Sequence, residues 1–188
     1  MEIDLDIQRA KDFAHRSHDS AGQTRKYSGD PYWVHTDEVA EFVRLFGGDK
    51  NQIITGHLHD TVEDVKTVSL DIIRTEFGAD VADLVSDLSG VTSLADGNRA
   101  IRKQIEKEHT AQASPRAKTV KLADILSNFA SFSLMLENDR KFAIKYLKEK
   151  LSLLEVLKEG DKSLYIRVQE TLNQAQFLVN DTCGNEDF

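Results

Sequence analysis

The sequence is poor in cysteine, proline and glycine, and it contains no long hydrophobic run. Its single cysteine, Cys183, excludes an internal disulfide and a zinc site built from cysteines. Two prolines, Pro31 and Pro115, and ten glycines in 188 residues disfavour a many-turned β-sandwich or barrel and favour long helices. No apolar run reaches the roughly 18 residues that span a membrane. Residues 1–6 hold three acids and no base, unlike a secretory signal peptide, so we expect a cytoplasmic protein.

Positive charge is also scarce over the chain as a whole. The 24 Lys and Arg residues face 32 Asp and Glu residues, which gives a formal net charge of -8. This balance disfavours nucleic acid as a partner, and we expect no membrane partner. A phosphorylated small molecule stays open if a metal ion or a local basic cluster supplies positive charge. The length fits one folded domain over residues 1–179, followed by a flexible acidic tail over residues 180–188. The oligomeric state stays open.

Apolar residues recur at helical spacing along most of the chain. Pro115 stands where the most apolar segment would begin, at a position in a helix that favours proline. No convincing strand is present, so the expected fold class is all-α, a compact multi-helix bundle. The expected helices cover about residues 5–20, 36–46, 49–60, 69–77, 79–88, 99–111, 115–136, 139–160 and 161–179. The polar stretch 90–98 is the best candidate for a mobile loop.

The segment that follows Gly56 has the clearest chemical pattern. His59 and Asp60 together offer an imidazole nitrogen and a carboxylate oxygen, which are natural ligands for Mn²⁺, Fe²⁺ or Zn²⁺. If the helix continues, Glu63 and Asp64 follow one turn later, at the same edge. One of these acids could accept a proton from water at the metal. The alternative is a solvated acidic helix end.

Two further residues, His35 and Asp124, extend this pattern. Asp124 lies in the most hydrophobic predicted helix, where an unpaired carboxylate is costly to bury, so it needs a metal or a basic partner. The alternative for Asp124 is a salt bridge to Lys121, and the alternative for His35 is a capping or core histidine. Asn128 follows Asp124 by one helical turn and shares its face.

The order of these residues resembles that of the HD-domain metal-dependent phosphohydrolases, and in more detail the hydrolase domain of the RelA/SpoT family. The similar segments are 22–26, 29–32 with His35, 59–64, 108–109, 114–115, 117–118 and 121–124 with Asn128. The similarity covers residues 10–128, and the length leaves no room for the synthetase and regulatory domains of long members. The chain therefore resembles a small alarmone hydrolase, similar to the metazoan SpoT homologue.

The resemblance implies an all-helical, Mn²⁺-dependent 3′-pyrophosphohydrolase with one ion per site. Such enzymes release pyrophosphate from the 3′ position of guanosine tetra- or pentaphosphate, a small-molecule nucleotide. The metal ligands that the family pattern implies are His35, His59, Asp60 and Asp124. By the same pattern, Glu63 and Asp64 would orient or deprotonate the attacking water.

The resemblance also implies residues that contact the substrate. Arg25 and Lys26 would contact the nucleotide, and Asn128 would contact its sugar or base. Arg102 and Lys103 belong to a local basic excess before the Asp124 helix, and they are candidates for contacts to the distal phosphates. The alternative for this basic excess is a solvated helix face.

Several positions depart from the family pattern. Ile125 and Ser127 stand where the family often has Arg and His. Neither is a metal ligand, but the departures leave the preferred base open. The alternatives are an adenosine alarmone, an NADPH 2′-phosphatase or another HD nucleotide phosphohydrolase, and a non-catalytic alarmone-binding module.

Overall fold

Helices make up most of the chain, and polar side chains cap many of their first turns. The computed structural model describes residues 4–183, and this part has no strand beyond an isolated bridge between Thr24 and Pro31. In chain order the elements are α1 (Leu5–Ser20), α2 (Trp33–Leu45), α3 (Lys50–Leu58), α4 (Thr61–Asp64), α5 (Leu70–Phe77), α6 (Ala79–Leu88), the 3₁₀ helix η1 (Leu94–Asp96), α7 (Arg99–Gln112), α8 (Pro115–Phe129), α9 (Phe132–Asn138), α10 (Arg140–Leu154) and α11 (Lys162–Cys183). The side chains of Asp49, Ser69 and Ser114 accept hydrogen bonds from the first-turn N–H groups of α3, α5 and α8. The all-α fold class is confirmed.

Some helix limits differ from those that the sequence predicts. Helix α2 begins at Trp33, three residues earlier than expected, so His35 lies within its first turn. The helix expected over 115–136 is divided, because Ser131 leaves the helical region with φ -106° and ψ 18°. This break lets Phe132 stack on Phe129, with 5.0 Å between the ring centroids. The helix expected over 139–160 ends earlier, at Leu154.

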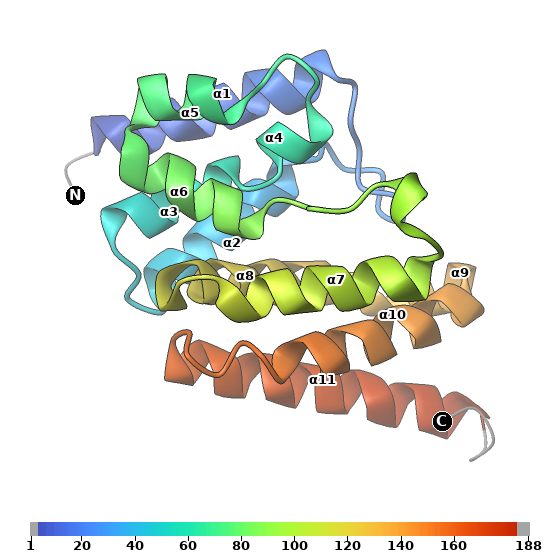
Figure 1. Ribbon diagram of the computed structural model, residues 1–188. Helices are drawn as coiled ribbons and strands as arrows, with labels where there is room; N and C mark the ends of the chain where they lie inside the picture. Colours follow the sequence, from blue (N-terminus) through green and yellow to red (C-terminus); the bar gives the residue numbers. More distant parts are fainter. Residues whose placement is uncertain (1–3, 184–188) are drawn as a thin grey trace.

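Helix α8 runs through the centre of the protein. Figure 1 shows α1 to α6 above it and α10 and α11 below it. Most of its side chains are buried, and it packs against α2, α3, α6 and α11. A helix that is covered on several sides must be apolar on most of its surface. Polar residues such as Asp124 and Ser127 therefore need specific partners there.

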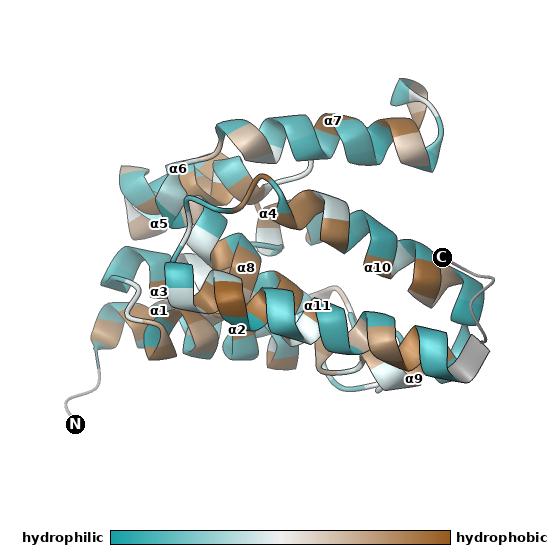
Figure 2. Ribbon diagram, turned by 90° about the horizontal axis from the view of Figure 1, so that it is seen from below, coloured by the Kyte–Doolittle hydropathy of each residue, from teal (hydrophilic) through white to brown (hydrophobic). Residues whose placement is uncertain are grey.

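Helix α7 differs from α8 because it meets the neighbouring helix α10 through polar contacts. Thr110 is its only buried residue. Arg99 Nη2 lies 2.7 Å from Glu149 Oε2, and Lys107 Nζ lies 2.6 Å from Glu155 Oε2. Figure 2 shows α7 as a mostly hydrophilic helix at the edge of the protein. Charged bridges therefore join α7 to α10.

The last helix, α11, continues to Cys183, beyond residue 179, where the sequence predicts a flexible tail to begin. The rest of that predicted tail, residues 184–188, lies outside the described residues. Among the helices of the described part, none combines the length and the apolar character that a membrane crossing needs.

Candidate metal site and adjoining pocket

Four side chains from three parts of the chain meet at one point. His35 comes from α2, His59 and Asp60 come from the turn between α3 and α4, and Asp124 comes from α8. His35 Nε2 lies 3.5 Å from both Asp60 Oδ2 and Asp124 Oδ1, and His59 Nε2 lies 3.2 Å from Asp60 Oδ2. One ligand atom from each of His35, His59 and Asp124 lies within 4.8 Å of the others. The structure thus brings together the four residues that the sequence analysis selects.

Gly56 brings the two histidines together. A Cβ atom at this position would lie 2.7 Å from the Cα of Ala40, so any other residue would force α2 and α3 apart. The carbonyl oxygen of Gly56 also accepts a hydrogen bond of 2.9 Å from Nδ1 of His59. This bond places the proton of the neutral imidazole on Nδ1 and turns Nε2 toward the carboxylates.

A buried network orients His35 in the same way. Ser127 Oγ donates to Glu38 Oε2 at 2.5 Å, so its lone pairs accept from His35 Nδ1 at 2.8 Å. Arg25 supports this pair, because it donates to Glu38 Oε2 at 2.9 Å and to the carbonyl oxygen of Ser127 at 3.1 Å. Ser127, which departs from the family pattern, is therefore the partner that holds His35.

The inward-facing nitrogens of both histidines fit a bound cation. Nε2 of His35 and Nε2 of His59 are buried, and neither has a well-formed hydrogen bond in the described part of the chain. A buried nitrogen without a partner is costly, so it calls for an explanation. Two imidazole nitrogens with carboxylate oxygens form a donor set that suits a divalent metal of mixed N and O preference. These residues therefore form a fitting divalent metal site.

The charges around the site favour a positive group at its centre. Burial alone would lower the pKa of His35, but the hydrogen bonds and charges of Asp124 and Asp60 raise that pKa to about 9. Burial alone would raise the pKa of both Asp60 and Asp124. Neighbouring groups, chiefly His59, nevertheless hold the pKa of Asp60 well below the usual range. Lys121 does the most to lower the pKa of Asp124 in the same way. A cation and the proton of His35 therefore compete for the same place.

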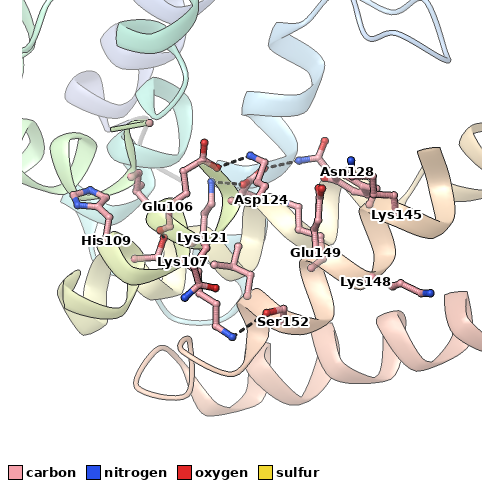
Figure 3. Close-up of a pocket in the computed structure, with 18 of the residues that line it drawn as sticks. Glu106, Lys107, His109, Lys121, Asp124, Asn128, Lys145, Lys148, Glu149 and Ser152 are labelled. Atoms are coloured by element: carbon pink, nitrogen blue, oxygen red, sulfur yellow. Dashed lines mark hydrogen bonds and ion pairs between the residues drawn. The ribbon is translucent and has the colours of Figure 1, made fainter. Parts of the chain in front are cut away.

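Asp124 has a basic partner as well as histidine neighbours. Its Oδ2 lies 2.8 Å from Lys121 Nζ, and its Oδ1, which faces His35, accepts a bond of 2.6 Å from Asn128 Nδ2. Figure 3 shows Lys121 and Asn128 on either side of the carboxylate. The two interpretations of Asp124, as a salt-bridge partner and as a metal ligand, are therefore compatible because they use different oxygens.

The loop before α2 carries Arg25 and Lys26, whose contact with the nucleotide stays a prediction. Arg25 and Lys26 do not line the pocket beside the metal site. Lys26 is exposed, with Nζ 3.8 Å from Asp139 Oδ2. Tyr32 does line the pocket, and its hydroxyl donates to Asp60 Oδ2 at 2.7 Å. Sequence reasoning missed this role of Tyr32, although the residue belongs to the 29–32 segment that carried the resemblance.

Glu63 and Asp64 lie in α4, and both line the pocket beside Asp60. Partial burial and the charge of Asp60 raise the pKa of Asp64 to about 6. Glu63 Oε2 accepts a hydrogen bond of 3.0 Å from the backbone N–H of Gly90. Both acids are therefore placed where they can take a proton from a group in the pocket, and their catalytic role stays a prediction.

The pocket has a volume of about 670 Å³ and is lined mainly by α7, α8 and α10 together with α4. Asp60, Asp124 and Asn128 lie in its wall. Its basic lining residues are Lys103, Lys107, Lys121, Lys141, Lys145, Lys148 and Lys150. Figure 3 shows that α7, α8 and α10 all contribute side chains to this space. Six carboxylates also line the pocket, but α10 contributes four of the lysines and only one acid, Glu149. The α10 side of the pocket therefore suits a polyanionic ligand.

The contribution of α10 was missed by sequence reasoning, although a signal was present. Lys141, Lys145 and Lys148 follow one another at spacings of four and three residues, which places them on one helix face. Of the two basic candidates before α8, Lys103 lines the pocket and pairs with Glu106 at 2.5 Å. Arg102 does not line it and donates instead to the carbonyl oxygen of Gly97 at 2.8 Å.

Comparison with known protein families identifies the family of this chain. The sequence pattern of the HD domain matches residues 10–148. The chain therefore belongs to the HD-domain family.

Individual relatives confirm the resemblance to RelA/SpoT-type proteins. A "Probable GTP diphosphokinase" of the chloroplast in Oryza sativa subsp. japonica is 40% identical over 139 residues, which is 69% of this chain and 19% of that protein. A Synechocystis protein named "Probable guanosine-3′,5′-bis(diphosphate) 3′-pyrophosphohydrolase" is 38% identical over 144 residues, or 73% of this chain and 18% of that protein. The chain spans about one fifth of the length of these relatives.

Two solved structures share the fold. A metazoan orthologue of SpoT, described as hydrolysing ppGpp, superposes with a TM-score of 0.81 at 23% identity and covers 93% of this chain and 97% of that chain. A protein of Listeria monocytogenes EGD-e superposes with a TM-score of 0.61 at 23% identity and covers 78% of this chain and 99% of that chain. These likenesses confirm the HD-domain arrangement of helices.

Proposed function

We propose that the protein is a metal-dependent 3′-pyrophosphohydrolase of guanosine tetra- and pentaphosphate. The observation that carries this proposal is the convergence of His35, His59, Asp60 and Asp124 beside a lysine-lined pocket. The name of the Synechocystis relative and the description of the metazoan structure support the substrate. We further propose one Mn²⁺ ion per site, because mixed imidazole and carboxylate ligands suit it.

A divalent cation at these ligands supplies Lewis acidity toward a phosphate oxygen and lowers the pKa of water beside it. Glu63 accepts the proton of the attacking water, and Asp64, which lines the pocket beside Asp60, orients that water. The water oxygen forms a bond to the phosphorus atom that is attached to the ribose 3′ oxygen. The bond between that phosphorus and the ribose 3′ oxygen breaks. The ribose oxygen takes up a proton from solvent, and pyrophosphate leaves.

The remaining polar residues of the pocket suit the rest of the nucleotide. Asn128 donates one amide N–H to Asp124, so its side-chain carbonyl oxygen and its second N–H are available to a sugar hydroxyl or base. The lysines of α7 and α10 offset the charge of the other phosphates. Ile125 and Ser127 are fully buried and do not line the pocket, so they do not read the base directly.

A substrate panel with chromatographic identification of the products tests the proposal. With Mn²⁺, the protein is expected to convert guanosine tetraphosphate to GDP and pyrophosphate. Turnover of the adenosine alarmone alone would move the preference to adenine, and orthophosphate release from NADPH would indicate a 2′-phosphatase. Tight nucleotide binding without any hydrolysis would contradict the enzyme and favour a binding module.

The charge of Lys150 predicts a pH dependence of substrate capture. Burial lowers the pKa of Lys150 to about 8, and within the described residues no carboxylate lies at ion-pair distance from it. The ammonium is charged below this pKa and neutral above it, so kcat/KM, which reports the free enzyme, is expected to fall severalfold as pH rises through about 8. K150R keeps its charge and is expected to lose this decline. Identical pH profiles for the two proteins would contradict the prediction.

A further inference from the structure

The backbone of Gly90 contacts the proposed proton acceptor directly. Its N–H donates to Glu63 Oε2 at 3.0 Å, although the two residues are 27 positions apart. Gly90 lies just after α6, at the start of the segment that leads to η1 and α7. Both residues line the pocket.

The backbone conformation does not require glycine at this position. Gly90 is not among the glycines with positive φ, so another residue could adopt its backbone angles. A Cβ atom at Gly90, however, would lie 3.1 Å from both carboxylate oxygens of Glu63. This distance is shorter than an ordinary van der Waals contact, so a side chain here would push the carboxylate away. The carboxylate of Glu63 is therefore the group that a side chain at position 90 would displace.

Contacts on both sides hold Gly90 in place. On one side, Ser89 Oγ donates to the carbonyl oxygen of Val85 at 2.8 Å. On the other, Thr92 Oγ1 donates to Glu106 Oε1 at 2.9 Å, and this ties the segment to α7. Glu63 itself is exposed and belongs to a helix of only four residues. A long exposed side chain loses rotamer freedom when a fixed donor holds it.

We propose that Gly90 is a positioning residue that aims the carboxylate of Glu63 through its N–H group and its lack of a side chain. This inference rests on the proposed function, in which Glu63 accepts a proton from the attacking water. Gly90 acts through Glu63 on the chemical step, so its alteration is expected to affect kcat more than KM. Displacement of a catalytic group by a fraction of an ångström is enough to slow a reaction.

A double-mutant cycle tests the proposal. G90A is expected to lower kcat about tenfold and to leave KM within about twofold, because the added methyl group displaces the carboxylate. E63D shortens the side chain by one methylene group and so moves the carboxylate away from position 90. In this variant, the methyl group that G90A adds has room. In the E63D background, G90A is therefore expected to lower kcat by less than about threefold. Equal effects of G90A in both backgrounds would overturn the proposal.

A control and a second measurement separate this proposal from the proposed function. V91A changes the next residue, which is about half exposed and does not line the pocket, and it is expected to keep the wild-type kcat. Without substrate, the Gly90 amide signal in NMR is expected to move upfield and to exchange faster with solvent in E63A than in the wild-type protein. An unchanged Gly90 amide would overturn the inference even if the enzyme is active. A changed amide in a protein that hydrolyses no alarmone would support the contact while the proposed function fails.

Discussion

H59A is expected to lose the bound cation and to lower hydrolysis by more than about 10³-fold, because the cation supplies several kcal/mol of transition-state stabilisation. His59 Nε2 is one of two buried nitrogens that face the carboxylates, and alanine leaves too few donors to hold the ion. D124A is expected to give the same loss. It should also lower the Tm, because Lys121 Nζ loses the carboxylate that lies 2.8 Å away.

H57A is the matched control for H59A. His57 is buried near the end of α3, two residues before His59, and its Nδ1 lies 3.1 Å from Asp37 Oδ1. Metal content after dialysis against Mn²⁺ measures the difference, with circular dichroism as a check on folding. H57A is expected to retain one ion per chain. A folded H59A protein with the wild-type metal content would contradict the assigned ligand set.

E63A is expected to keep the cation and to lower kcat by about 10²-fold or more, which is typical for the loss of a general base. Glu63 lines the pocket, and its carboxylate is held by Gly90 N–H, whereas the converging ligand atoms belong to other residues. Metal content and single-turnover rates, measured on the same preparation, separate binding of the ion from the chemical step.

E41A is the matched control for E63A, because Glu41 is an exposed acid whose carboxylate pairs with Arg44 within α2. It is expected to leave both metal content and rate unchanged. The assignment of Glu63 as a proton acceptor fails if E63A turns over within about threefold of the E41A protein.

Much of the site could be predicted from the sequence because its strongest signals are local. His59, Asp60, Glu63 and Asp64 stand within six consecutive residues, so any helical or turned backbone keeps them near one edge. Asp124 was conspicuous because a carboxylate within an apolar helix needs a partner. The resemblance to the RelA/SpoT hydrolase domain then linked these residues to His35, which lies far away in the chain.

The partners of these residues could not be predicted because they depend on how helices cross. Ser127 holds His35 across 92 positions, and Arg25 reaches Ser127 across 102 positions. The family pattern predicts that Arg25 contacts the nucleotide, whereas in the structure its guanidinium braces Glu38 and Ser127. No spacing rule reports which two of many polar side chains will meet after folding.

The sequence by itself determined that the chain forms helices and which residues are candidates for binding a metal, because helical periodicity and ligand type are properties of short segments. The tertiary structure alone decided that α10 brings its lysines opposite α7 and that Gly90 meets Glu63. Charged bridges such as Arg99 to Glu149 hold α7 beside α10, and the hydrogen bond from Gly90 N–H to Glu63 joins the segment after α6 to α4. Packing of this kind sums many weak contacts between distant segments, and no single segment encodes it.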